Sequence, residues 1–293
     1  MNALRHELPT AMRRLARAPG FSFAVVSFLG LSIAALLAVA AAVYGLMLRP
    51  LPYPDAERLV DVGGQSRAMS FSLGLSAPLI AELDETYDGL VALGAWERRR
   101  GEEGLEPTAV QPGVLAALGV APRLGRAFED ATIASDEDAI LISEGLWASR
   151  FARDPGVLGQ SIDYAGRERR IVGVMPAAFR FPDGTANAWL PLHLTPADTA
   201  PQNAQVFGGL QVVARLAPDG SVAALDAALQ ARYGDDERIA GIREHMKLVF
   251  EAKPLREALA RGKSELVVLL GIAVAVVLLT TLANLANLWL TRA

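Results

Sequence analysis

Two long runs of apolar residues interrupt a chain in which apolar and polar positions otherwise alternate over short distances. Residues 21–48 contain no charged side chain, and neither do residues 266–290. A helix needs about 20 apolar residues to cross a hydrocarbon layer of about 30 Å, so each run predicts one transmembrane helix. The region between them, residues 49–265, carries the patterns of a folded domain.

The pattern inside this region predicts a mixture of strands and helices. Short alternating or continuous apolar runs predict strands, at residues 139–142, 161–164, 169–175, 210–216 and 246–251. Serines followed by apolar residues about four apart predict helices, at residues 77–87, 145–152 and 222–233. The irregular interleaving favours an α+β fold over a doubly wound sheet. The predicted fold class is a membrane protein in which two transmembrane α-helices flank an α+β domain.

The charges beside the first apolar run predict its orientation. Residues 1–20 contain four arginines and one glutamate, whereas acidic and basic side chains balance just after residue 48. Positive charge favours the cytoplasmic side, so we expect the N-terminus and residues 291–293 in the cytoplasm and the domain outside it. The alternative for the first run is a cleavable signal peptide, but the run exceeds the usual apolar core of about 7–15 residues.

Residues 1–20 themselves carry apolar side chains about four apart, with arginines between them. This spacing predicts a basic amphipathic helix that lies along the inner membrane surface, with its arginines near anionic lipid. The alternative is a solvated tail that only sets the orientation.

Three prolines follow the first apolar run in the segment LRPLPYPDAERLV, residues 48–60. Pro50, Pro52 and Pro54 lack a backbone donor and hold the residues before them in extended conformations. We expect them to end the helix at the outer membrane face and to set the direction in which the domain begins. They form the candidate helix–domain junction.

Small residues recur every four positions in the first run and predict a helix-packing face. They are Gly30, Ala34, Ala38 and Ala42. Small side chains let helix backbones approach closely. The alternative is that alanine is simply abundant in this run.

Polar residues in and just after the second run share one helical face, which is the second predicted packing face. They are Thr280, Asn284, Asn287 and Thr291. Polar side chains in hydrocarbon find partners across helices, so we expect this face to meet further helices or a second protomer. For Asn287 and Thr291 the alternative is a position among the lipid headgroups.

Composition narrows the chemistry. The chain has 293 residues, 52% of them hydrophobic, with a net charge of -4 and no cysteine. A disulfide or a thiol nucleophile is therefore ruled out. Without a basic patch, the sequence gives no support for nucleic-acid binding.

We expect neither enzyme activity nor a bound cofactor, because no catalytic motif is recognisable in the sequence. The tripeptide GKS at residues 262–264 resembles the end of a phosphate-binding loop, but Glu257 stands where that loop requires glycine. Ser143 lacks flanking glycines, so helix capping explains it better than a nucleophile does. The acidic residues 136–138 lack the spacing of a calcium loop and are interpreted as a solvated loop.

Five segments carry a resemblance to a known family: RRLARAPGFSF, LRPLPYPDAERLV, GVAPRLGRAF, AILISEGLWASRFARDPGVLGQSI and RIVGVMPAAFRFP. In this order they resemble the FtsX/MacB-like permeases of ABC transporters, close to the orphan permeases of acidobacterial type. The resemblance covers nearly the whole chain, and the order of helix, large domain and helix is similar too.

The resemblance implies a MacB-like periplasmic core domain at residues 49–265 of a multi-pass protein of the bacterial inner membrane. It implies a cytoplasmic ABC ATPase partner that binds ATP, a dimer of permeases, and a periplasmic adaptor or effector. The implied function is to relay ATP-driven motion to the periplasmic domain, for export or mechanotransmission.

The sequence departs from the family pattern in two ways. Residues 111–115, QPGVL, stand where many relatives have an aromatic pair after Ser-Pro-Gly, so a partner contact here lacks its usual residues. The family has further helices after the second one, so we expect this chain to be a truncated fragment. A rival from another class is a membrane-anchored sensor or scaffold, which a downstream kinase or cyclase domain would favour over further hydrophobic segments.

Overall fold

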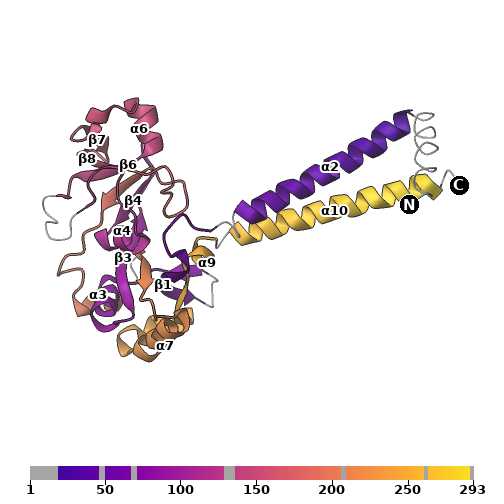
Figure 1. Ribbon diagram of the computed structural model, residues 1–293. Helices are drawn as coiled ribbons and strands as arrows, with labels where there is room; N and C mark the ends of the chain where they lie inside the picture. The colour runs from indigo at the N-terminus through magenta and orange to yellow at the C-terminus, as the bar shows by residue number, and fades with distance from the viewer. Residues whose placement is uncertain are drawn as a thin grey trace. The chain divides into compact units, whose positions relative to one another are not determined.

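The computed structural model describes residues 19–45, 50–66, 71–128, 136–205, 209–260 and 263–290 (Figure 1). The chain divides into two compact units. We call Met1–Arg49 with Ala260–Ala293 the helical unit, and Pro50–Leu259 the sheet domain. Most of the predicted helix at residues 1–20 lies outside the described residues.

The helical unit contains two long helices that contact each other, α2 (Pro19–Val43) and α10 (Lys263–Leu290) (Figure 1). Large apolar side chains are exposed on α2, among them Phe23, Val26, Leu31, Ile33, Leu36 and Leu37. Exposed ones on α10 include Val268, Leu269, Ile272, Val276, Leu279 and Leu282.

In the part of the chain that the structure describes, no helix combines the length and the apolar character needed to cross a bilayer. The two transmembrane spans therefore stay predictions.

The sheet domain is built on an 11-stranded mixed sheet with the order β11-β1-β10-β3-β4-β9-β6-β8-β5, in which β2 also pairs with β1 and β7 with β8. The strands are β1 (Leu59–Ser66), β2 (Phe71–Leu73), β3 (Leu90–Arg98), β4 (Pro107–Val110), β5 (Leu124–Gly125), β6 (Ala139–Ser143), β7 (Ser161–Tyr164), β8 (Arg167–Met175), β9 (Ala188–Pro191), β10 (Gln211–Leu216) and β11 (Leu248–Pro254). The pairs β4–β9 and β6–β8 are parallel, and the remaining pairs are antiparallel.

Helices accompany this sheet and confirm the α+β class of the domain. They are α3 (Ala77–Thr86), α4 (Pro112–Leu118), α6 (Glu144–Phe151), α7 (Val222–Tyr233), α8 (Ala240–Met246) and α9 (Leu255–Ala260). Short 3-10 turns are η2 (Ala56–Arg58), η3 (Pro155–Val157), η4 (Pro201–Gln205) and η5 (Glu237–Ile239).

The two faces of the sheet bury two separate cores. The major core includes Val60, Leu79, Ile140, Val212, Ala214, Leu225, Tyr233 and Phe250. The minor core includes Tyr53, Leu59, Trp96, Leu141, Phe181, Trp189, Val213 and Leu255. Neighbouring residues of one strand belong to different cores because successive side chains point to opposite faces.

The edge strand β11 is covered by side chains of α7. Gln230 donates a hydrogen bond to the carbonyl of Phe250, and the backbone N–H of Ala252 donates to Asp226 at 3.2 Å. The last strand before α9 is thus fastened to α7 as well as to β1.

The predicted strands at β6, β7, β8, β10 and β11 are confirmed, as are the helices α3, α6 and α7. The hydroxyl of Ser143 accepts from the N–H of Leu146 at 3.0 Å, and that of Ser221 from Ala224 at 3.1 Å, so both are helix caps. Between β7 and β8, Ala165 and Gly166 both have positive φ, as a tight hairpin turn requires.

Strands β1, β2, β3, β4, β5 and β9 were not predicted. Glycines interrupt the apolar pattern of β1 and β3, and the four-residue strands β4 and β9 contain Pro107 and Pro191. Glycine and proline are depleted in strands, so propensity points away from these segments and long-range pairing overrides it.

Candidate functional site

The candidate site is the segment that begins the sheet domain. Pro50, Pro52 and Pro54 are exposed, whereas Leu51 and Tyr53 between them pack against the minor core. An extended backbone turns alternate side chains to opposite sides, so proline at every second position leaves the other positions free to be buried. The apolar side chains thus hold the segment to the core, and the direction-setting role of the prolines stays a prediction.

Tyr53 is the deepest of these contacts, with 8% of its surface exposed. Its ring meets the ring of Phe179 edge to face, with centroids 6.4 Å apart. Burial raises the pKa of the Tyr53 phenol well above its ordinary value, which keeps the group neutral inside the core.

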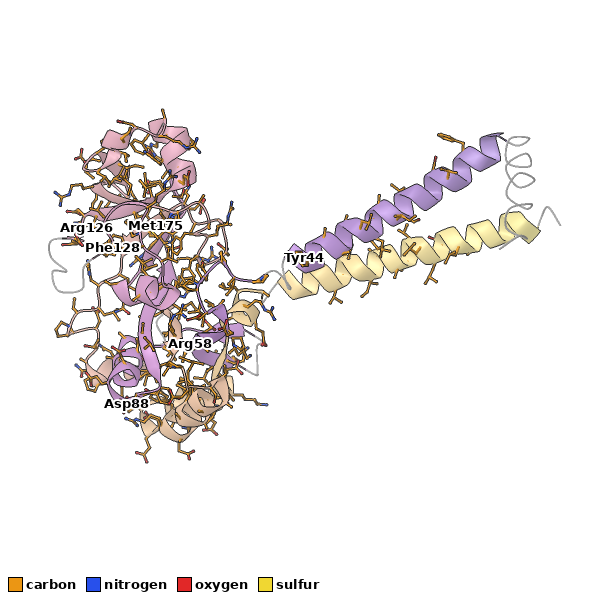
Figure 2. All side chains as sticks on the ribbon, in the orientation of Figure 1. Tyr44, Arg58, Asp88, Arg126, Phe128 and Met175 are labelled. Atoms are coloured by element: carbon orange, nitrogen blue, oxygen red, sulfur yellow. The ribbon has the colours of Figure 1, made fainter. Side chains whose placement is uncertain are left out.

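The segment then turns sharply at Asp55. Asp55 has φ 45° and ψ 50°, a left-handed conformation, and its carbonyl accepts from the backbone N–H of Arg58 at 2.9 Å. The guanidinium of Arg58 donates twice to the carbonyl of Leu216 at the end of β10, at 2.9 and 2.7 Å. Arg58 lies in the sheet domain (Figure 2) and joins this turn to a strand far along the chain.

Arg215 makes the strongest polar connection at this site. It lies on β10 with 8% of its surface exposed, and it alternates with the major-core residues of that strand. Its guanidinium donates to the carbonyls of Ala117 at 2.7 Å, Pro54 at 2.7 Å and Asp55 at 3.3 Å. A planar, permanently charged fork can serve several acceptors at once, so one side chain fixes the segment to α4 and to the sheet.

Gly119 lets the segment come this close to α4. It caps the C-terminal end of α4 with φ +65°, a conformation that favours glycine. A Cβ at this position would lie only 2.8 Å from Cγ of Pro54.

The end of the sheet domain is held by the same core. Leu255, the first residue of α9, is 1% exposed within the minor core, and Leu259 is packed against it. We call this arrangement the junction anchor: the segment 50–55 with Arg58, Gly119, Arg215 and Leu255. Both ends of the sheet domain are therefore fastened to one face of one sheet.

The predicted packing faces are only partly covered by the described residues. Gly30, Ala34 and Ala38 are exposed on α2, and a Cβ added to Gly30 would meet nothing within 4 Å. The hydroxyl of Thr280 donates to the carbonyls of Val276 and Val277, each at 2.9 Å, within its own helix. The side chains of Ala42, Asn284 and Asn287, and all of Thr291, lie outside the described residues. Both faces stay predictions.

The acidic residues 136–138 differ from the predicted solvated loop. Asp136 is 1% exposed and receives two hydrogen bonds from Arg126, at 2.9 and 2.6 Å. Glu137 and Asp138 are exposed and pair with Arg167. The interpretation is wrong for Asp136, because an arginine ten positions earlier supplies the partner that burial requires. Among the described residues, no acidic or histidine cluster suited to a metal ion is found.

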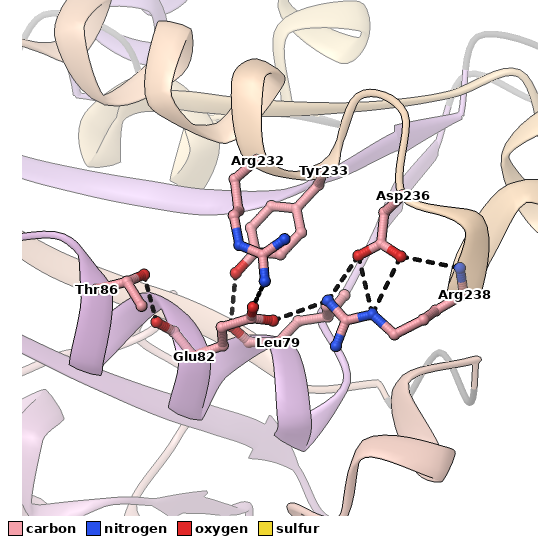
Figure 3. A network of polar contacts seen from close by, with 7 residues as sticks. All are labelled: Leu79, Glu82, Thr86, Arg232, Tyr233, Asp236 and Arg238. Atoms are coloured by element: carbon pink, nitrogen blue, oxygen red, sulfur yellow. Dashed lines mark hydrogen bonds and ion pairs between the residues drawn. The ribbon is translucent and has the colours of Figure 1, made fainter.

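A second polar cluster, which sequence reasoning missed, joins α3 to α7 and η5 (Figure 3). Glu82 of α3 forms ion pairs with Arg232 and with Arg238, the latter at 2.9 Å, and Arg238 also pairs with Asp236 at 2.6 Å. Hydrogen bonds from the Arg238 side chain hold the pKa of Asp236 below its ordinary value. We call these four residues the α3–α7 bridge.

Comparisons with known proteins agree with this fold. A family model described as the MacB-like periplasmic core domain matches residues 22–232. A solved domain assigned to a permease from Porphyromonas gingivalis is similar, at 21% identity and a TM-score of 0.50 over 69% of this chain and 92% of that one.

Two other solved structures are similar at lower scores. The periplasmic region of MacB from Actinobacillus actinomycetemcomitans has 10% identity and a TM-score of 0.46, over 67% of this chain and 88% of that one. The extracellular domain of the noncanonic ABC-type transporter YknZ from Gram-positive bacteria has 13% identity and a TM-score of 0.41, over 67% of this chain and 99% of that one. No curated protein matches the sequence.

Proposed function

The chain belongs to the family of MacB-like periplasmic core domains, and from that premise we propose that it is the permease subunit of an ABC transporter of the MacB/FtsX type. In this role the permease does not bind ATP itself. A cytoplasmic ATPase subunit binds and hydrolyses ATP, and the permease relays the resulting motion to the sheet domain in the periplasm.

The observation that carries this proposal is the junction anchor. Leu51 and Tyr53 at the start of the sheet domain, and Leu255 at its end, are held by the same minor core. A displacement applied to either end therefore acts on the same face of the sheet. Arg215 bonds to backbone carbonyls, so movement of the segment is opposed without relying on flexible side-chain partners.

The proposed topology places α2 and α10 across the bacterial inner membrane, with the N-terminus in the cytoplasm. The uncharged runs 21–48 and 266–290 and the basic residues before the first run support it. Exposed leucine, isoleucine, valine and phenylalanine side chains along both helices suit contact with lipid (Figure 2). Two such permeases would associate through the two predicted packing faces.

Co-purification tests the partnership. The full-length protein is purified from its native membrane in mild detergent, and the proteins that accompany it are identified and assayed for ATP hydrolysis. We expect a stoichiometric nucleotide-binding subunit with vanadate-sensitive activity. Its reproducible absence under crosslinking would sink the permease proposal in favour of a membrane-anchored sensor or scaffold.

A second experiment tests the relay itself. Because the chain has no cysteine, Glu168→Cys on the exposed β7–β8 hairpin gives one labelling position per protomer, and energy transfer between two labelled protomers reports on domain movement. We expect ATP to change this signal in the parent protein. Replacing Pro50, Pro52 and Pro54 by glycine should leave membrane insertion intact and abolish the change.

The matched control is Pro196→Gly, in an exposed loop of the same domain. It should respond to ATP as the parent does. An undiminished response in the triple glycine variant would refute a relay through the junction.

A further inference from the structure

A pocket of about 230 Å³ opens in the sheet domain beside α3, away from the residues of the junction anchor. Its apolar walls are Ile80, Leu93 and Leu194, and its polar lining comes from Asp84, Gln111 and Thr199. The pocket thus places polar groups beside a smaller area of aliphatic surface.

The floor of the pocket is rigid because two backbones lie in direct contact there. A Cβ on Gly113 would lie 1.9 Å from the carbonyl oxygen of Leu93, and a Cβ on Gly94 would lie 2.2 Å from the backbone nitrogen of Val114. Only glycine permits this approach between the start of α4 and β3. This side of the pocket is therefore held by direct backbone packing.

Gln111 is fixed at one side of the pocket. Its backbone N–H donates to the carbonyl of Ala95 at 2.9 Å, and its side-chain carbonyl accepts from the N–H of Ala95 at 2.8 Å. Within the described residues, its amide nitrogen makes no hydrogen bond, although that nitrogen carries two donor hydrogens. The residue can therefore donate to a carbonyl of a bound group without giving up its own position.

The charge at the pocket is negative. Asp84 lines it, the exposed Glu85 follows in the last turn of α3, and the exposed Asp88 lies in the turn after that helix. Asp84 has a partner within the chain, and an ionised carboxylate offers about four lone-pair sites, so it can accept a further donor. No lysine or arginine is among the residues that line the pocket.

The size of the pocket selects the kind of occupant. Sites for drug-sized ligands hold roughly 300–1,000 Å³, so a pocket of about 230 Å³ suits a group no larger than one amino-acid side chain. A lysine or arginine side chain has an apolar stem for the aliphatic walls and a positive end for Asp84.

We propose that this pocket receives one lysine or arginine side chain of a protein partner outside the cytoplasm. The backbone carbonyl beside that side chain accepts from the amide of Gln111. The proposal rests on the proposed function for the placement of the sheet domain in the periplasm.

The test uses the full chain in detergent and three capped amino acids as probes: Nα-acetyl-lysine methylamide, Nα-acetyl-arginine methylamide, and the uncharged Nα-acetyl-norleucine methylamide. Binding is measured by ligand-observed NMR titration. We expect the capped lysine or the capped arginine to bind about two- to fivefold more tightly than norleucine methylamide, which is the range that one partly exposed ion pair provides. Equal affinity for norleucine methylamide, or no binding of any probe, would overturn the proposal.

Two variants and one control assign the binding to this pocket. Asp84→Asn should lower the affinity of the two charged probes to that of norleucine methylamide. Ala81→Phe should fill the pocket and abolish the binding of all three probes. Glu85→Gln changes a neighbouring exposed acid that does not line the pocket and should leave affinities unchanged. Binding that survives Asp84→Asn and Ala81→Phe would contradict the assignment. No probe requires the ATPase, so failure here leaves the permease proposal to its own co-purification test.

Discussion

The junction anchor and the α3–α7 bridge both use arginine to join segments far apart in the chain, yet they differ in what the arginine meets. Arg215 has 9% of its side chain exposed and donates mainly to backbone carbonyls, with the carboxylate of Asp55 3.9 Å away, whereas Arg232 has 49% exposed and pairs with a carboxylate. Water and salt compete with an exposed ion pair far more than with a buried donor. The junction anchor is therefore the stiffer connection, at the ends of the domain, and the α3–α7 bridge between the helices is the one that solvent and salt can weaken.

The largest effect is expected from removing the buried cation. Arg215→Met keeps an unbranched stem but removes the guanidinium donor from the carbonyls of Ala117 and Pro54, whereas the carbonyl of Asp55 keeps the N–H of Arg58. We expect the free energy of unfolding to fall by about 3 kcal/mol, since hydrogen bonds to charged groups contribute roughly 1.5–3 kcal/mol each. The free energy of unfolding of Arg215→Lys should lie between those of the parent and of Arg215→Met. All three are measured by denaturant unfolding, followed by tryptophan fluorescence. Parent-like stability of Arg215→Met would remove the distinction between the two connections.

The second prediction distinguishes two costs of a side chain at Gly119: the cost of its backbone conformation and the cost of steric contact with Pro54. Gly119→Ala places a Cβ 2.8 Å from Cγ of Pro54 at a residue with φ +65°. The control Gly166→Ala has φ +71° with nothing within 4 Å, so it reports conformational cost alone. We expect Gly119→Ala to lose about 1 kcal/mol more than the control in thermal unfolding. Equal losses would show that the approach of Pro54 to α4 carries no strain.

A third, smaller effect tests the bridge. Glu82→Gln removes the carboxylate that Arg232 and Arg238 share. We expect the free energy of unfolding to fall by about 1 kcal/mol at low ionic strength. This decrease should be smaller in 1 M salt, where charges are screened beyond about 3 Å. Glu85→Gln, on the same helix, should change little. The loss of stability in Arg215→Met should change less with salt, because Arg215 bonds mainly to backbone carbonyls and its contact with the carboxylate of Asp55 is long, at 3.9 Å. A loss as salt-dependent as that of Glu82→Gln would show that the two connections do not differ.

The smallest effect concerns pH. Hydrogen bonds from Arg238 lower the pKa of Asp236 from 3.8 in the folded protein. A carboxyl with a depressed folded pKa contributes stability that is present above its unfolded value and is lost as pH falls through the folded value. The difference in stability between the parent and Asp236→Asn should be constant from about pH 7 to 5 and should diminish below pH 3.8. A difference that grows on acidification would reverse the assigned direction.

Local signals predicted the elements whose causes are local. Ser143 and Ser221 cap helices because the backbone N–H groups that donate to their hydroxyls lie three residues away, and the hairpin follows from the turn at Ala165 and Gly166. The spacing of Pro50, Pro52 and Pro54 likewise pointed to a directed junction, although its role stays a prediction.

The hydrogen bonds of Arg215 in the junction anchor could not be predicted from local signals. An arginine in the apolar strand at residues 210–216 signals a buried cation, but its acceptors lie 161 positions away at Pro54 and 98 away at Ala117. The sequence of the strand does not indicate which carbonyls these acceptors are. The α3–α7 bridge was missed for the same reason, since Glu82 and Arg238 are separated by 156 positions.

The covering of β11 by α7 bears on how copies of the protein can coexist in a crowded compartment. An open edge strand is a template on which a second chain can add a strand, and such sheet extension leads to aggregation. Here Gln230 and Asp226 already occupy backbone groups of Phe250 and Ala252. Two sheet domains held side by side therefore cannot fuse into a continuous sheet through this part of β11, and assembly must use side-chain surfaces that can also separate.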